Sequence, residues 1–134
     1  METKNIKESV IFPGKPSVVY KAWMNSKKHG KMIGGSAKID PKVGGKFSIW
    51  DRQITGKTLK LDPRKNRITQ EWRYEYEDWP KDKPSIITLE FLPHKEGQCR
   101  LEFSQTGIPE KYANEIDDGW KEYYWEPMNK FFAS

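Results

Sequence analysis

The sequence predicts an α+β fold, in which an antiparallel sheet carries a long C-terminal helix and short helices follow the first strand. Three observations lead to this prediction. Short alternating runs separated by turn signals fill residues 36–107, which is the pattern of an antiparallel meander. A proline-led amphipathic segment starts at Pro16, as helices often do. The stretch from Gly119 to Phe132 shows helical periodicity and holds six of the eighteen aromatic residues.

The length and composition are those of a folded domain. The 134 residues fall within the usual size of a single domain, so we expect one domain over residues 1–134. Charged residues make up 32% of the chain, but aromatic residues make up 13%. That aromatic content argues against disorder, because each ring buries a large area. We therefore expect an aromatic-rich core.

Charge and cysteine content argue against several classes of function. The formal charge of +5 comes from 24 basic and 19 acidic residues whose signs are interspersed, unlike the clustered stripe of a nucleic-acid-binding protein. The lone Cys99 cannot form an internal disulfide, and the first ten residues lack the apolar core of a signal peptide. No run is long enough to cross a membrane. We expect a reduced, cytoplasmic setting without nucleic-acid or membrane partners.

The N-terminal third predicts a strand followed by short helices. Residues 5–12 alternate, with Ile6 and Phe12 on one parity, which is typical of a strand. After Pro16, Val19 and Trp23 lie four residues apart on one helical face. Residues 25–35 are basic and interrupted by glycines, so we expect at most two helical turns there and then a mobile connection.

Three later runs alternate clearly and predict strands with one sheltered and one solvated face. They span residues 67–76, 85–92 and 99–105. The positions on the sheltered parity are Ile68, Gln70, Trp72, Tyr74 and Tyr76, then Ile87, Leu89 and Phe91, and finally Cys99, Leu101 and Phe103.

The spacing of apolar residues in the last segment predicts a helix. At about 100° per residue, a stripe centred on Trp120 also takes in Tyr123, Tyr124, Pro127 and Phe131. We expect this stripe to lie on the sheet, with Asp117 and Asp118 at the helix N-terminus and a kink at Pro127. Trp125 and Phe132 fall roughly 120 to 140° away from the stripe.

No catalytic constellation is visible. His29 and His94 have no partner at metal-ligand spacing, so both are interpreted as surface histidines in loops. Cys99 lies on the inward parity of a strand, which favours a buried thiol over a reactive one. Gly44 and Gly45 open a strand rather than a phosphate-binding helix. We therefore expect a protein that is not an enzyme, with no catalytic residue, no metal and no cofactor.

The order of several stretches resembles a known family, the activators of heat-shock protein 90 ATPase and their homologues. This family has the helix-grip fold of the START and birch-pollen-allergen-like superfamily, in which a curved antiparallel sheet wraps around a long C-terminal helix. Each stretch is weakly specific alone, the last being the most specific, but together they cover essentially the whole chain. The stretches are FPGKPSVVYKAW (12–23), VGGKFSIWD with the following TGK (43–57), ITQEWRY (68–74), ITLEF (87–91), TGIP (106–109) and GWKEYYWEPMNKFF (119–132).

The resemblance is to the C-terminal domain of the two-domain co-chaperone, and no stretch of this sequence corresponds to its N-terminal domain. It implies a non-catalytic domain that acts by binding protein, with a heat-shock protein 90 homologue or another protein as partner. The candidate partner surface is Trp125 and Phe132, which lie off the core stripe, and the crowded Lys27, Lys28 and Lys31, which would steer an acidic partner.

An alternative function also follows from the resemblance. Helix-grip relatives often enclose a cavity between sheet and helix, and such a cavity would bind a small lipophilic or aromatic molecule. The same rings could instead simply fill the interior, since protein cores are close-packed. The candidate lining residues are Phe47, Ile49, Trp72, Tyr74, Leu89, Phe91, Phe103, Trp120 and Tyr124.

Overall fold

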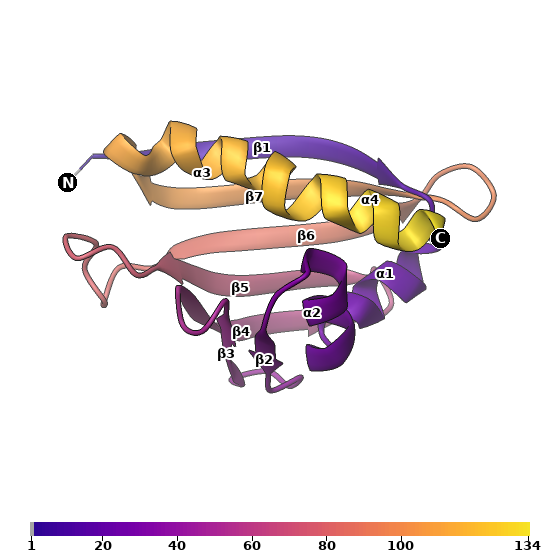
Figure 1. Cartoon of the computed structure of the whole chain (residues 1–134), viewed down its shortest axis with the longest axis horizontal. Helices are drawn as coiled ribbons and strands as arrows, with labels where there is room; N and C mark the ends of the chain where they lie inside the picture. The colour runs from indigo at the N-terminus through magenta and orange to yellow at the C-terminus, as the bar shows by residue number, and fades with distance from the viewer. Residues whose placement is uncertain (1) are drawn as a thin grey trace.

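A curved antiparallel sheet forms the body of the molecule (Figure 1). The computed structural model describes residues 2–134, and over that range the sheet has seven strands in the order β1-β7-β6-β5-β4-β3-β2. Every neighbouring pair is antiparallel, which confirms the predicted meander. The strands are β1 (Thr3–Phe12), β2 (Ala37–Ile39), β3 (Lys46–Ile49), β4 (Ile54–Asp62), β5 (Arg67–Tyr74), β6 (Ser85–Pro93) and β7 (Cys99–Pro109).

Two short helices connect β1 to β2, as predicted. They are α1 (Pro16–Trp23) and α2 (Ser26–Ile33). The Asn25 side chain caps α2 by accepting a hydrogen bond of 2.9 Å from the Lys28 N–H. Gly34 ends the helix at φ 68°, a left-handed conformation that glycine adopts without steric cost. These two signals limit α2 to the two turns expected from the sequence.

The C-terminal helix runs along the long strands (Figure 1). It begins at Ala113, after a 3₁₀ turn (Glu110–Tyr112), so the expectation that it starts near Asp118 is wrong. Its parts are α3 (Ala113–Trp120), a π-helical turn (Lys121–Trp125) and α4 (Glu126–Ala133). Among residues 2–134, no helix has the length and apolar character needed to cross a membrane.

The π-helical turn changes which residues face the sheet. The Glu126 N–H bonds to the Lys121 carbonyl, five residues back, and the following Pro127 has no N–H to give to the turn. The extra residue adds Trp125 and Met128 to the buried stripe, in which Trp120 and Tyr124 remain. Tyr123, expected on the sheet, is instead 53% exposed. A uniform 3.6-residue period cannot anticipate this shift.

Tryptophans at the centre of the interface between sheet and helix confirm the predicted core. Trp72 of β5 and Trp120 of α3 are each 1% exposed, and their ring centroids lie 5.2 Å apart. Buried indole N–H groups need acceptors, and two strand glutamines supply those of Trp120 and Trp23. Gln105 accepts from Trp120 Nε1 at 2.7 Å, and Gln70 accepts from Trp23 Nε1 at 3.0 Å. Among residues 2–134, the Trp72 Nε1 has no hydrogen-bond partner.

His29 is the clearest correction to the sequence interpretation, because it is not a surface residue of a loop. It lies on α2, is 1% exposed, and contacts the Trp23 carbonyl through Nδ1 at 2.8 Å and the Tyr124 hydroxyl through Nε2 at 2.9 Å. Burial lowers its pKa to about 4. The imidazole is therefore neutral at pH 7 and ties α2 to the C-terminal helix.

Candidate binding sites

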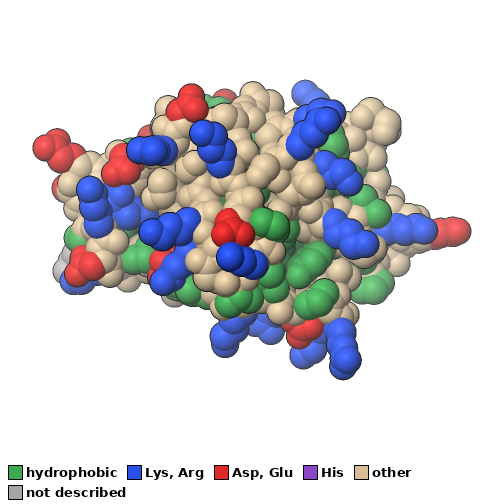
Figure 2. Space-filling view, turned by 90° about the horizontal axis from the view of Figure 1, so that it is seen from below, with side chains coloured by type: hydrophobic (Ala, Val, Ile, Leu, Met, Phe, Trp, Pro, Cys, Tyr) green, Lys and Arg blue, Asp and Glu red, His purple; other side chains and the backbone are tan. Residues whose placement is uncertain are grey.

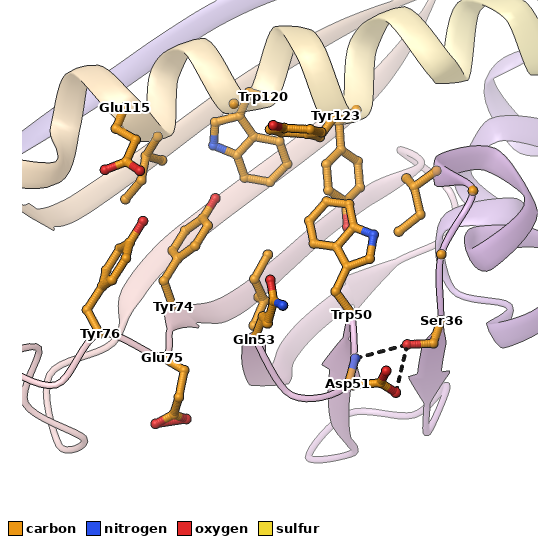
Figure 3. A pocket seen from close by; sticks show the side chains of 17 residues that line it. Ser36, Trp50, Asp51, Gln53, Tyr74, Glu75, Tyr76, Glu115, Trp120 and Tyr123 are labelled. Atoms are coloured by element: carbon orange, nitrogen blue, oxygen red, sulfur yellow. Dashed lines mark hydrogen bonds between the residues drawn. The ribbon is translucent and has the colours of Figure 1, made fainter.

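A pocket of about 880 Å³ opens between the C-terminal helix and the β3–β5 side of the sheet. Figure 3 shows side chains from the helix and from the sheet pointing into the same space. Its walls come from α3, the π-helical turn, the β3–β4 turn, the end of β5 and the connection between α2 and β2. Its size is within the range of small-molecule sites, roughly 300 to 1,000 Å³.

Aromatic rings form much of the pocket wall. Trp50 lies edge-on to Tyr123 and Tyr124, with centroid distances of 6.0 and 5.7 Å and interplanar angles of 76° and 71°. On the other side, Tyr74 and Tyr76 stack at 6.0 Å. All of these rings line the pocket, and Tyr124 also packs into the core, where it is 2% exposed.

Trp50 reaches the pocket through an unusual turn. Trp50, Asp51 and Arg52 all have positive φ angles, of 50°, 52° and 71°, and each such non-glycine residue costs about 1 to 3 kcal/mol. Ser36 holds the turn: its carbonyl accepts from the Trp50 N–H and its Oγ from the Asp51 N–H, each at 2.9 Å. A Cβ atom at Gly35 would lie 2.3 Å from Trp50 Nε1, so glycine is required for the indole to lie there.

The charged groups that line the pocket are carboxylates. They belong to Asp51, Glu75 and Glu115, and among residues 2–134 no Lys or Arg lines the pocket. Glu75 is paired, since its Oε1 accepts from Arg73 Nη1 at 3.0 Å. Burial and the nearby Glu115 raise the pKa of Tyr76.

The structure brings only some of the predicted cavity residues together. Tyr74, Trp120 and Tyr124 line the pocket. The other candidates lie in the close-packed core and do not border it; they are Phe47, Ile49, Trp72, Leu89, Phe91 and Phe103. Sequence reasoning missed Trp50 and Glu115 as site residues. The only signal for Trp50 is that an aromatic residue directly follows a predicted strand, and this pattern is too common to identify a residue of the pocket wall.

Trp125 is a second correction, since the sequence places it off the core stripe, on the candidate partner surface. It is 4% exposed and stacks on Trp120 at 5.2 Å, with Phe103 also at 5.2 Å. Its Nε1 donates to Glu8. Phe132 is half-buried against Phe12, at 6.4 Å. Trp125 is therefore a core residue of the free chain rather than an exposed partner anchor.

Lysines surround a shallow apolar groove beside α2. Lys27, Lys28 and Lys31 are exposed, and Figure 2 shows Lys and Arg side chains scattered around apolar ones on this side of the molecule. The groove, which we call the α2 groove, has a volume of about 590 Å³. It is lined by Tyr20, Lys21, Met24, Asn25, Ser26, Lys27, Ile39, Pro41 and Leu61.

Comparison with protein families identifies a match over most of the chain. The family described as "Activator of Hsp90 ATPase homolog 1-like protein" matches residues 14–133. Activator of 90 kDa heat shock protein ATPase homolog 1 from Mus musculus is 29% identical over 118 residues, which are 88% of this chain and 34% of the mouse protein. The chain thus spans about a third of the length of the curated relatives it matches.

Solved structures with the same fold include proteins with different descriptions. The crystal structure of an HSP90 activator from Plasmodium falciparum has a TM-score of 0.85 at 23% identity and covers 96% of both chains. CalU16 from Micromonospora echinospora has a TM-score of 0.80 at 21% identity, over 98% of this chain and 77% of its own. At such identities the likeness concerns the fold, and it agrees with the predicted helix-grip architecture.

Proposed function

Because the chain belongs to the family of activator of Hsp90 ATPase homolog 1-like proteins, we propose that it is a non-catalytic binding domain whose partner is a heat-shock protein 90 homologue. The observation that carries this proposal is the match over residues 14–133, together with a curated relative that is named as an activator of that ATPase. The proposal concerns the contact that this one domain makes, since the relatives are about three times longer.

Two side chains that could take part in acid–base or nucleophilic chemistry, His29 and Cys99, favour binding over catalysis. His29 is enclosed and neutral, and burial raises the pKa of the Cys99 thiol to about 11, far from the thiolate that a nucleophile needs. Within residues 2–134, no three His, Cys, Asp or Glu side chains lie close enough together to hold a metal ion. A binding role uses none of these groups.

The α2 groove is the surface that we propose for the partner. It combines an apolar floor that includes Ile39 and Leu61 with exposed lysines at its rim, and interfaces commonly have an apolar centre and a polar rim. Lys27 lines the groove, and Lys28 and Lys31 extend the positive charge along α2. Such a rim favours an acidic partner and accelerates association more than it tightens the complex.

The test is to mix the chain with a heat-shock protein 90 homologue from the same organism and to measure association and ATPase rates. Reversing Lys27, Lys28 and Lys31 to Glu should slow association about tenfold or more at low salt. The matched control reverses Lys81, Lys83 and Lys95, which are exposed on loops away from α2. Absence of binding, or equal slowing by both triple variants, would contradict the proposal.

A second candidate function is the binding of a small lipophilic or aromatic molecule, and the pocket of about 880 Å³ with its aromatic walls favours it. The binding of a heat-shock protein and of a small molecule would use different surfaces, so the two functions are compatible. Native mass spectrometry of the protein purified from its own source would reveal a bound molecule as a defined mass increment. Charge reversal on α2 should leave that increment unchanged.

A further inference from the structure

The pocket joins two features, aromatic walls and carboxylates without a basic side chain in the described lining. From this combination we infer that it binds an organic cation, namely a quaternary or methylated ammonium group. The inference rests on the second candidate function, since it assumes that the pocket takes a ligand, and it deepens that function by naming the ligand's charge and chemical class.

The charge balance of the pocket is opposite to that of the chain. The whole sequence carries +5, with 24 Lys and Arg residues, yet in the described chain Asp51, Glu75 and Glu115 line the pocket and no basic side chain does. Arg73 neutralises Glu75, and the exposed Asp51 accepts a hydrogen bond of 3.3 Å from Ser36 Oγ. Glu115 is thus the carboxylate that faces the space without a basic partner in the lining. An anionic ligand would enter against this charge, whereas a cation would be attracted.

The aromatic walls suit a cation with little affinity for water. Trp50 stands nearly perpendicular to Tyr123 and Tyr124, so the rings form adjoining walls rather than a flat stack. Tyr74 and Tyr76 add further rings from β5 and the segment after it. A cation over such faces is attracted to the rings, and aromatic cages are the usual receptors for quaternary ammonium groups.

A purely apolar occupant fits less well than an organic cation. In Figure 3 the Glu115 side chain points toward the tyrosine hydroxyls at one end, and Asp51 lies near Trp50 at the other. A hydrocarbon that filled this space would cover part of the Glu115 carboxylate and return no counter-charge, which is unfavourable. A methylated ammonium group offers apolar methyl groups to the rings and positive charge to the acids.

The turn that carries Trp50 is consistent with a pocket wall that is shaped for a ligand. Three successive positive φ angles and the close fit of the indole on Gly35 are costly features, and such strain tends to collect at functional sites. It places one large ring at the pocket mouth, opposite the helix.

The decisive experiment is isothermal titration calorimetry of the full chain with choline and with its neutral carbon isostere, in which a tert-butyl group replaces the trimethylammonium head. We expect choline to bind about tenfold more tightly than the isostere, or better.

Replacing Glu115 with Gln should weaken choline binding several-fold, and so should replacing Trp50 with Leu. Asp118→Asn is the matched control, because Asp118 is an exposed acid on the same helix that does not line the pocket. Circular dichroism melting checks that each variant is folded.

The cation could be a free small molecule or a side chain of a partner protein, and a second arm separates these sources. A capped tripeptide with trimethyllysine at its centre is titrated beside choline. Tighter binding of the peptide identifies a protein-borne cation, and tighter binding of choline identifies a free one. Either result supports the inference.

Two results would overturn it. If the neutral isostere binds as well as choline, the pocket takes lipophilic ligands and only the charge assignment fails. If neither choline, the isostere nor the tripeptide binds at millimolar concentration, the ligand function of the pocket fails as well. Neither result bears on the heat-shock protein proposal, which is tested on α2.

Discussion

The two flanks of the C-terminal helix use the same kinds of residue in opposite ways. On the flank that faces β1 and β7, Trp125 packs on Phe12 and Phe103, with ring centroids 6.1 and 5.2 Å away, and the interface is closed. On the flank that faces β3–β5, Tyr123 and Trp50 border an open pocket. Aromatic content alone therefore does not decide between core and cavity.

The largest effect should come from removing a ring on the closed flank. Trp125→Ala should cost about 3 to 5 kcal/mol of unfolding free energy, because it leaves a cavity among packed rings. Tyr123→Ala on the open flank should cost under about 1 kcal/mol, as is usual for exposed positions. Urea denaturation of both variants makes the comparison, and equal losses would show that the flanks do not differ in packing.

The next effect concerns His29, whose Nε2 contacts the Tyr124 hydroxyl between the two flanks. Its pKa is lowered from 6.5 to about 4 by burial, so the unfolded chain binds more protons between these values. Stability should fall as the pH drops from 6.5 to 4, by about 3 kcal/mol in total. His29→Gln should flatten this part of the pH profile, measured by chemical denaturation at each pH. An unchanged slope would mean that His29 does not titrate as an enclosed group.

Glu8 on the closed flank should give a pH dependence of the opposite sign. Its pKa is raised from 4.5 to about 7 by burial and then by Asp117, against smaller opposing effects of Trp125 and Lys121. The folded state therefore binds more protons, and the stability contributed by protonated Glu8 is present below pH 4.5 and lost as the pH rises to 7.

Glu8→Gln keeps an acceptor for the Trp125 indole and adds a donor for Asp117. It should therefore raise the melting temperature at pH 7.5 and change it little at pH 4.5. Glu115→Gln, on the open flank, should leave the melting temperature nearly unchanged at both pH values. Equal shifts in the two variants would remove this contrast.

The smallest effect tests the space on the open flank. A Cβ atom at Gly119 would meet nothing nearer than Tyr123 Cδ2 at 3.8 Å, and alanine favours the helix over glycine. Gly119→Ala should stabilise the protein by up to about 1 kcal/mol. Gly56→Ala is the opposite case, because its Cβ would overlap the Glu71 carbonyl, and it should destabilise strongly. A loss of stability in Gly119→Ala would indicate that the pocket is tighter than described.

Much of the fold could be predicted because period and parity are local properties. The alternation in β5, β6 and β7 predicts that Trp72, Leu89 and Phe103 lie in the core, and all three are buried. The family resemblance supplied the curvature of the sheet and the position of the helix on it. The fold depends on many residues whose patterns all indicate the same elements, so one misinterpreted residue does not change the predicted fold.

The candidate site was harder to predict because it depends on exceptions to those regularities. The π-helical turn moves Trp125 inward, the left-handed turn at Trp50 breaks the strand pattern, and His29 is buried by a contact 95 residues away in sequence. The turn at Trp50 and the burial of His29 depend on residues far away in the sequence, and the π-helical turn departs from the regular helical period. Tyr74, Trp120 and Tyr124 were found because they obey the regular pattern.

The turn at Trp50 has a spectroscopic consequence. Of the six tryptophans in the sequence, Trp23, Trp72, Trp79, Trp120 and Trp125 are buried, whereas Trp50 is half-buried at the pocket mouth. A collisional quencher in the solvent therefore reaches mainly Trp50, and the emission of the other five changes only when the core opens. The wild-type chain thus has separate optical signals for its pocket and its interior, and neither requires a label.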